Sequence, residues 1–132
     1  MLLENKVVIW DNILVKKSTR DFIHKGESIM EKKHVVIGVS GGIAAYKACD
    51  LVSKLSKKDY EIKVVMTKHA QEFVKPINFE SLSKHKCEVS LFDETNEDPI
   101  AHITLAKWAD IMVLVPATAN IIAKVVHGIA DD

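Results

Sequence analysis

Several features that would narrow the function of a protein are missing from this chain of 132 residues. Its 18 basic side chains balance 18 acidic ones, so the charge gives no reason to expect nucleic acid or a membrane surface as a partner. The two cysteines, Cys49 and Cys87, show neither CxxC nor metal-ligand spacing, and we interpret both as buried small residues. The histidines as a set lack such spacing too, so no metal site is predicted.

Membrane and export signals are also missing. No apolar run approaches the ~20 residues that a membrane-spanning helix needs. Met1-Leu2-Leu3 is followed at once by charged residues, where a signal peptide would have an apolar core. Hydrophobic residues nevertheless make up 48% of the chain, which is ample for the core of one domain. We therefore expect a cytoplasmic protein in a reducing environment.

Residues 1–29 differ in character from the rest. Residues 6–10 and 13–15 are strand-like, but a polar stretch without a clear period follows them. Codons for Lys25-Gly26-Glu27 can resemble a bacterial ribosome-binding site, at a distance that suits initiation at Met30. We hypothesise that residues 1–29 are translated upstream sequence; an ordinary N-terminal extension is the alternative. Sequencing the N-terminus of the natural product separates the two.

From Lys33 onward, strand-like and helix-like segments alternate, which predicts an α/β fold with a parallel sheet, right-handed crossovers and flanking helices. Four strands make a small open sheet, so we expect the domain of residues 30–132 to be incomplete at its C-terminal end. The predicted strands are 34–39, 62–66, 89–92 and 111–115, and the predicted helices or helical turns are 43–57, 70–74, 76–82, 102–109 and 117–127.

The turn Ser40-Gly41-Gly42 lies between the first of these strands and a helix. Glycines allow a tight turn, and the helix N-terminus offers unpaired N–H groups and a partial positive charge that suit a phosphate. The turn also falls at the carboxyl end of a strand, where open α/β sheets bind ligands. An anion site is therefore predicted, although the pattern is neither GxGxxG nor a P-loop, and a tight turn without a ligand is the alternative.

Two further strand-to-helix junctions carry hydroxyl or amide side chains. Thr67 follows the second strand, and Thr118-Ala119-Asn120 follows the last strand through small residues that would let a flat ring or a phosphate lie against the backbone. Both junctions have a simpler interpretation, in which Thr67, and Thr118 or Asn120, only cap the helices that follow.

His102 opens a helix after an acidic loop. An imidazole in that position can act as a general base near neutral pH, and a surface or capping histidine is the alternative. Trp108, in the same helix, is predicted to lie in the core.

Taken together, these segments resemble the flavin-dependent cysteine decarboxylases, specifically the phosphopantothenoylcysteine decarboxylase half of the bacterial bifunctional coenzyme A biosynthesis flavoprotein. The resemblance runs from about Lys33 to Asp132. It is carried by the sequence SGGIAAYK at 40–47, by His102-Ile103 leading into Trp108-Ala109-Asp110, and by residues 116–132.

The resemblance implies a flavodoxin-like (Rossmann-like) fold with FMN bound between the subunits of a homotrimer, often assembled into a dodecamer. It also implies that FMN oxidises the cysteinyl thiol of 4'-phosphopantothenoylcysteine, that carbon dioxide leaves, and that the reduced flavin returns its electrons to give 4'-phosphopantetheine. His102 is implied as the catalytic base. The residues implied to line the FMN site are Ser40, Gly41, Gly42, Ile43, Thr67, Thr118, Ala119 and Asn120.

The chain departs from the family pattern in places. Ile121 stands where the family has threonine, and the family's Pro-x-Met-Asn motif and flap cysteine would follow Asp132, which predicts a partial domain. A peptidyl-cysteine decarboxylase of the lantibiotic type and a non-catalytic FMN-binding or regulatory subunit are the alternatives. A prenyl-FMN-forming prenyltransferase is disfavoured, because His102 before the Trp-Ala-Asp segment does not fit that group.

Overall fold

The computed structural model describes residues 7–10, 13–17, 32–89, 101–129 and 131. They form one five-stranded sheet with the order β1-β2-β5-β3-β4. The strands are β1 (Val7–Trp10), β2 (Ile13–Lys17), β3 (Lys33–Val39), β4 (Tyr60–Met66) and β5 (Ile111–Leu114). The helices are α1 (Ala45–Ser56), α2 (Pro76–Ser83), α3 (Ala101–Trp108), α4 (Ala119–His127) and the short 3-10 helix η2 (Lys68–Glu72).

The central part of the sheet is parallel. β3 pairs in parallel with β4 on one side and with β5 on the other. The order β4-β3-β5 places the second parallel strand, the first and the third side by side, which is how a flavodoxin-like sheet begins. The predicted flavodoxin-like α/β fold is therefore confirmed.

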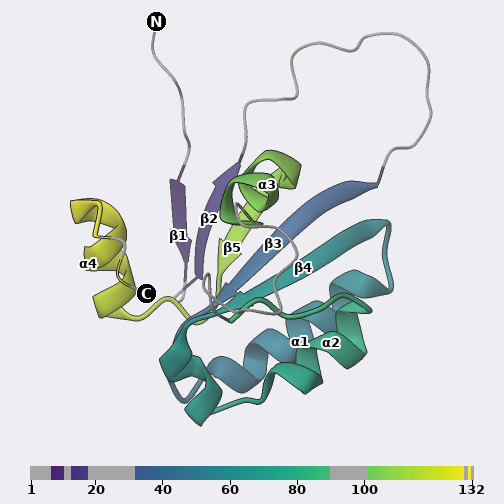
Figure 1. Cartoon of the computed structure of the whole chain (residues 1–132), viewed down its shortest axis with the longest axis horizontal. Helices are drawn as coiled ribbons and strands as arrows, with labels where there is room; N and C mark the ends of the chain where they lie inside the picture. The colour runs from purple at the N-terminus through teal and green to yellow at the C-terminus, as the bar shows by residue number, and fades with distance from the viewer. Residues whose placement is uncertain (1–6, 11–12, 18–31, 90–100, 130, 132) are drawn as a thin grey trace, which may run out of the picture.

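The main core lies between the sheet and the layer formed by α1 and α2 (Figure 1). Alternate residues of β3 and β4 point into it, as the two-residue period of a strand requires. Ala45, Ala48 and Val52 line the facing side of α1 at helical spacing. Phe79 of α2 closes the layer and is fully buried. The strand residues in this core are Val35, Ile37, Val39, Ile62, Val64 and Met66.

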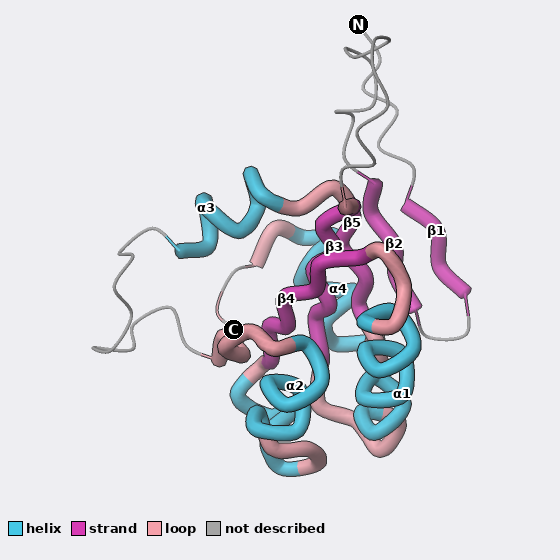
Figure 2. Tube along the Cα trace, turned by 90° about the vertical axis from the view of Figure 1, so that its right-hand side faces the viewer, coloured by secondary structure: helices cyan, strands magenta, loops and turns pink. Residues whose placement is uncertain are grey.

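The other side of the sheet is covered differently. α3 lies away from α1 and α2, on the far side of the strands (Figures 1 and 2). Gly38 of β3 is among the residues that face this side, and a Cβ built there would overlap the Leu114 side chain of β5 and meet the methyl of Met112 at 3.5 Å. Glycine at position 38 thus lets the side chains of β5 fold across β3. Met112 is still 38% exposed, so this side is the more open one.

β1 and β2 come from the N-terminal segment. β2 pairs antiparallel with β5, with Val15 opposite Val113, and β1 pairs antiparallel with β2. β2 therefore occupies the edge of β5 where the order of a flavodoxin-like sheet puts a fourth parallel strand. The hypothesis that residues 1–29 are translated upstream sequence stays a prediction.

The strand predicted at residues 89–92 has no counterpart among the described residues. Glu88 forms an isolated parallel bridge to Val65, Val89 is not in a strand, and residues 90–92 lie outside the described part. The other strand and helix predictions from Lys33 onward agree with the structure to within a few residues.

Candidate functional site

The turn after β3 leads directly into the N-terminus of α1. Ala44 holds the N-cap position and makes no side-chain capping bond, and the first turn of α1 has no acidic residue. The Ala45 N–H donates to the Gly42 carbonyl at 2.9 Å, which closes the turn. Because no side chain of its own satisfies the first N–H groups of α1, this terminus is suited to an external anion.

The two glycines of the turn differ in how closely other residues pack against their Cα atoms. A Cβ on Gly41 would overlap the His69 ring and lie 3.1 Å from the His69 carbonyl carbon. A Cβ on Gly42 would meet Thr118 Cγ2 at 3.6 Å and Pro116 Cγ at 3.7 Å, which is ordinary contact. His69 is therefore a site residue that the sequence reasoning missed. Its position two residues after Thr67, in the same junction, was the available signal.

Ser40 ties the turn to the segment after β5. Its side chain is buried, its hydroxyl donates to the Pro116 carbonyl, and the same oxygen accepts the Thr118 N–H at 3.3 Å. The peptide bond before Pro116 is cis. The hydroxyl of Ser40 is thus engaged within the protein, where it fixes the two loops relative to each other.

Thr67 and Thr118 both act as helix caps, which is the simpler role that the sequence left open. The Thr67 hydroxyl accepts the Ala70 N–H at 3.2 Å, and the Thr118 hydroxyl accepts the Ile121 N–H at 3.3 Å. The Thr67 N–H also donates to the Val39 carbonyl at 3.0 Å, next to the glycine turn. Three junctions therefore meet at the carboxyl end of the parallel strands, where their predicted FMN contacts remain predictions.

The surface beside these junctions is open. Ile43 is 85% exposed, and Ala119 and Asn120 are also exposed. Small or exposed residues on both sides of the glycine turn leave room for a flat group to approach the backbone.

His102 lies apart from the junctions. It is exposed in the first turn of α3, and in the described part of the chain its side chain makes no hydrogen bond or ion pair. No contact among the described residues joins it to the glycine turn, so its predicted role as the base stays a prediction.

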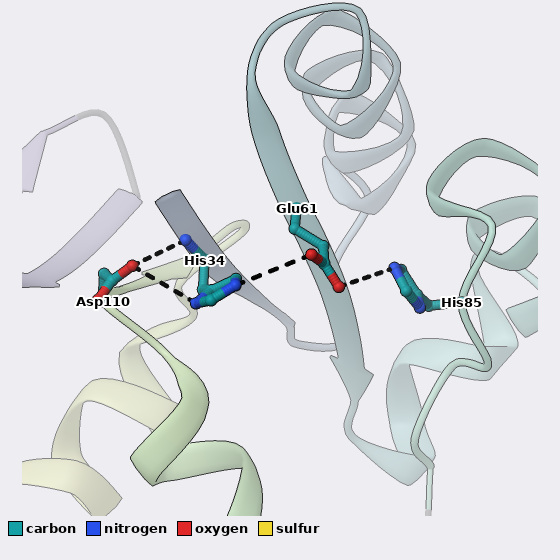
Figure 3. A network of polar contacts seen from close by, with 4 residues as sticks. All are labelled: His34, Glu61, His85 and Asp110. Carbon is teal, nitrogen blue, oxygen red and sulfur yellow. Dashed lines mark hydrogen bonds and ion pairs between the residues drawn. The ribbon is translucent and has the colours of Figure 1, made fainter. Parts of the chain in front are cut away.

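A charged cluster lies at the opposite, amino end of the sheet (Figure 3). His34 Nδ1 lies 3.7 Å from Asp110 Oδ2, and His34 Nε2 lies 3.8 Å from Glu61 Oε2. Glu61 Oε1 lies 3.6 Å from His85 Nε2. An open cavity of about 480 Å³ borders this cluster and contains none of the predicted site residues in its lining. In the described ranges no cluster of histidine, cysteine or carboxylate side chains forms a metal site.

Trp108 belongs to the same end of the sheet, and its predicted place in the core is wrong. The residue is half-buried, its ring stacks on His34 at 4.5 Å between centroids, and Lys63 Nζ lies 4.6 Å from the centre of a Trp108 ring. The large apolar ring suggested burial, but α3 ends at the rim of the sheet, where charged side chains surround it.

Neither cysteine is set up as a nucleophile. Burial, together with the nearby carboxylates of Glu80 and Glu88, raises the pKa of the Cys87 thiol from 9.0 to about 12. Burial also raises the pKa of Cys49, which is half-buried against the core. Both thiols therefore stay protonated near neutral pH and behave as small packing residues.

Comparison with known proteins agrees with this arrangement. The family model described as Flavoprotein matches residues 23–132. The chain is 47% identical over 104 residues to the coenzyme A biosynthesis bifunctional protein CoaBC of Bacillus subtilis, covering 79% of this chain and 26% of that protein. The protein of the same name from Escherichia coli K12 is 44% identical over 100 residues. The chain thus spans about a quarter of the length of these relatives.

Solved structures share the fold. The FMN-dependent cysteine decarboxylase SpaF superposes with a TM-score of 0.68 at 34% identity, covering 77% of this chain and 59% of that one. HAL3 from Cryptococcus neoformans superposes with a TM-score of 0.60 at 32% identity, covering 75% and 59%. Among the described residues, no helix is both long and apolar enough to cross a bilayer.

Proposed function

Because the chain belongs to the flavoprotein family, we propose that it binds a flavin, as FMN, with the phosphate at the Ser40-Gly41-Gly42 turn. The observation that carries this proposal is the uncapped N-terminus of α1 directly behind the glycines. The neighbouring helix α4 and the helix η2 are capped by their own threonines, whereas no side chain caps α1.

The residues present fit such a group. Ser40 holds the Pro116–Thr118 backbone against the turn, so the two sides of the site are fixed before any ligand arrives. Ile43, Ala119 and Asn120 are exposed beside it and would line the flavin ring. Bound there, FMN would supply a two-electron oxidant for a thiol.

We further propose that the protein decarboxylates a cysteinyl substrate. We propose 4'-phosphopantothenoylcysteine as that substrate, so that the reaction would belong to coenzyme A biosynthesis. The support is the identity to two CoaBC proteins and the likeness to SpaF, an FMN-dependent cysteine decarboxylase. In this proposal His102 is the base that accepts a substrate proton at its imidazole. The likeness to SpaF leaves a different cysteinyl substrate as the second candidate.

We propose a homotrimer, or a dodecamer built from four such trimers, as the working assembly. Exposed apolar side chains lie at Ile43 just before α1, at Tyr46 in its first turn, and on or beside α4 at Val125, Val126 and Ile129. Apolar surface of this kind favours association. A second copy would also give His102 a route to the flavin turn that the single chain does not provide. The mass of the assembly, measured by light scattering, tests this point.

The test of the cofactor is direct titration with FMN. Quenching of flavin fluorescence is expected for the wild type and for Lys54→Ala, which changes an exposed side chain at the far end of α1. Gly41→Ala is expected to weaken binding, because its Cβ meets His69. Failure of the wild type to bind FMN would refute the proposed function at its first step.

The test of the reaction is release of carbon dioxide from 4'-phosphopantothenoylcysteine by the FMN-loaded protein. Turnover that His102→Asn abolishes supports the decarboxylase. FMN binding without turnover on this substrate or on a cysteine-ending peptide contradicts it and leaves a non-catalytic FMN-binding subunit.

A further inference from the structure

We propose that His34, Trp108 and Asp110 form a latch that fixes the orientation of α3, which makes them positioning residues for His102. The proposal rests on the proposed role of His102 as the base. It gives a function to the Trp108-Ala109-Asp110 segment, which the flavin site does not use.

α3 has little else to hold it. Of its side chains from residue 102 onward, only Leu105 and Trp108 are partly covered, and the remaining five are exposed. The helix has eight residues, a length that is marginal without tertiary contacts. Its placement therefore depends on the C-terminal turn, where Trp108 lies.

The ring stack is the first half of the latch. The His34 and Trp108 rings lie 4.5 Å apart with 29° between their planes, which is a stacked arrangement. The Lys63 ammonium from β4 adds a cation–π contact to the same indole. Residues from β3 and β4 thus hold the last side chain of α3.

The second half of the latch is a reciprocal pair of hydrogen bonds next to the stack. The backbone N–H of His34 donates to Asp110 Oδ2 at 2.9 Å, and the backbone N–H of Asp110 donates to the His34 carbonyl at 2.9 Å. The Asp110 carboxylate also faces the His34 ring, as Figure 3 shows. Since Asp110 comes just after α3, these bonds fix where the helix ends relative to β3.

The latch acts on His102 through α3, because anchoring the C-terminal turn stabilises the helix whose first turn carries His102. His102 and Trp108 stand at opposite ends of α3, about 9 Å apart along its axis at 1.5 Å per residue. A change in the direction of the helix at Trp108 is therefore carried to the imidazole at the other end. A general base requires accurate placement, so a loosened latch lowers turnover without touching the cofactor.

The primary test is hydrogen exchange of the α3 amides in the full chain, comparing His34→Gln with His85→Gln. His34→Gln removes the ring, and we expect α3 exchange to rise roughly three- to tenfold, the equilibrium equivalent of one aromatic stacking contact. His85→Gln removes the outer member of the charged cluster, which contacts Glu61 and not α3, so it is the matched control. Equal α3 exchange in wild type and His34→Gln overturns the latch.

A second variant guards against a general loss of structure. His34→Phe keeps a ring to stack on Trp108 and is expected to restore most of the α3 protection, while exchange of β4 stays at the wild-type level in all three variants. A rise in β4 exchange equal to that of α3 would show loosening of the whole sheet and would contradict the proposal.

The consequence for catalysis is tested by measuring kcat and the FMN dissociation constant of the same variant. His34→Gln is expected to lower kcat and to leave the FMN dissociation constant unchanged, because the flavin turn lies at the other end of the strands. Unchanged kcat together with raised α3 exchange overturns the positioning role. If the wild type binds no FMN, only the proposed function is refuted. The hydrogen-exchange measurement still tests the latch, because it does not depend on FMN.

Discussion

The two ends of the parallel sheet are built from opposite kinds of residue. At the carboxyl end, Ser40, two glycines and two threonines make contacts through backbone groups and hydroxyls. At the amino end, His34, Glu61, His85 and Asp110 face one another as ionisable side chains. At the first end no side chain caps α1, whereas at the second the ionisable side chains contact one another. In our proposals the carboxyl end binds the cofactor and the amino end anchors a helix.

The largest expected effect comes from filling the carboxyl end. Gly41→Ala places a Cβ against the His69 ring and backbone, and we expect it to lower the free energy of unfolding by about 3 kcal/mol, as severe overpacking does. Gly42→Ala is the matched control, because its Cβ makes only ordinary contacts. Urea denaturation of both variants measures the difference. Similar stability of the two would mean that His69 does not cover Gly41 in solution.

Removing the link between the two loops is the next largest change. Ser40→Ala leaves the Pro116 carbonyl and the Thr118 N–H without their partner, at a cost of about 2 kcal/mol in unfolding free energy. FMN affinity is expected to fall as well, because the loops lose their fixed spacing. Denaturation and FMN titration of the same variant measure the two effects. Loss of stability without loss of affinity would show that the spacing of the loops does not matter for FMN binding.

A change at the amino end sharpens the comparison. Asp110→Ala removes the acceptor of the half-buried His34 N–H, and we expect it to cost about 1 kcal/mol of unfolding free energy. FMN affinity is expected to match that of the wild type, in contrast to Ser40→Ala. An equal loss of affinity in the two variants would show that the ends of the sheet are coupled.

The smallest expected effect lies between the two ends, at Cys87. Its folded pKa of about 12 exceeds the ordinary 9.0, so its contribution to stability is complete below pH 9 and is lost as the pH rises from there towards 12. Cys87→Ala removes this dependence of the unfolding free energy on pH. The stability difference between wild type and variant, measured by urea denaturation at about pH 8 and about pH 10, should therefore shrink on going to the higher pH. A constant difference would contradict the raised pKa.

The sequence was most informative where local rules decide the structure. The apolar runs of β3, β4 and β5 and the glycines at 41 and 42 predicted the parallel sheet and its turn, because strand period and turn chemistry act over a few residues. Contacts between distant segments were not predictable in this way. The Ser40–Thr118 bond and the His34–Asp110 bond join residues far apart in the chain, and the stack on Trp108 depends on where α3 meets the sheet.

The pairing of β2 with β5 bears on how molecules of this protein meet one another. An uncovered strand edge is a template that recruits strands from other chains. β2 covers that edge of β5 with Leu14 opposite Leu114 and Val15 opposite Val113. A polypeptide starting at Met30 would carry the same turn and the same latch but an open template beside them. The choice of initiation codon would then decide which strand forms this edge of the sheet, β1 of the N-terminal segment or β5 of the parallel core.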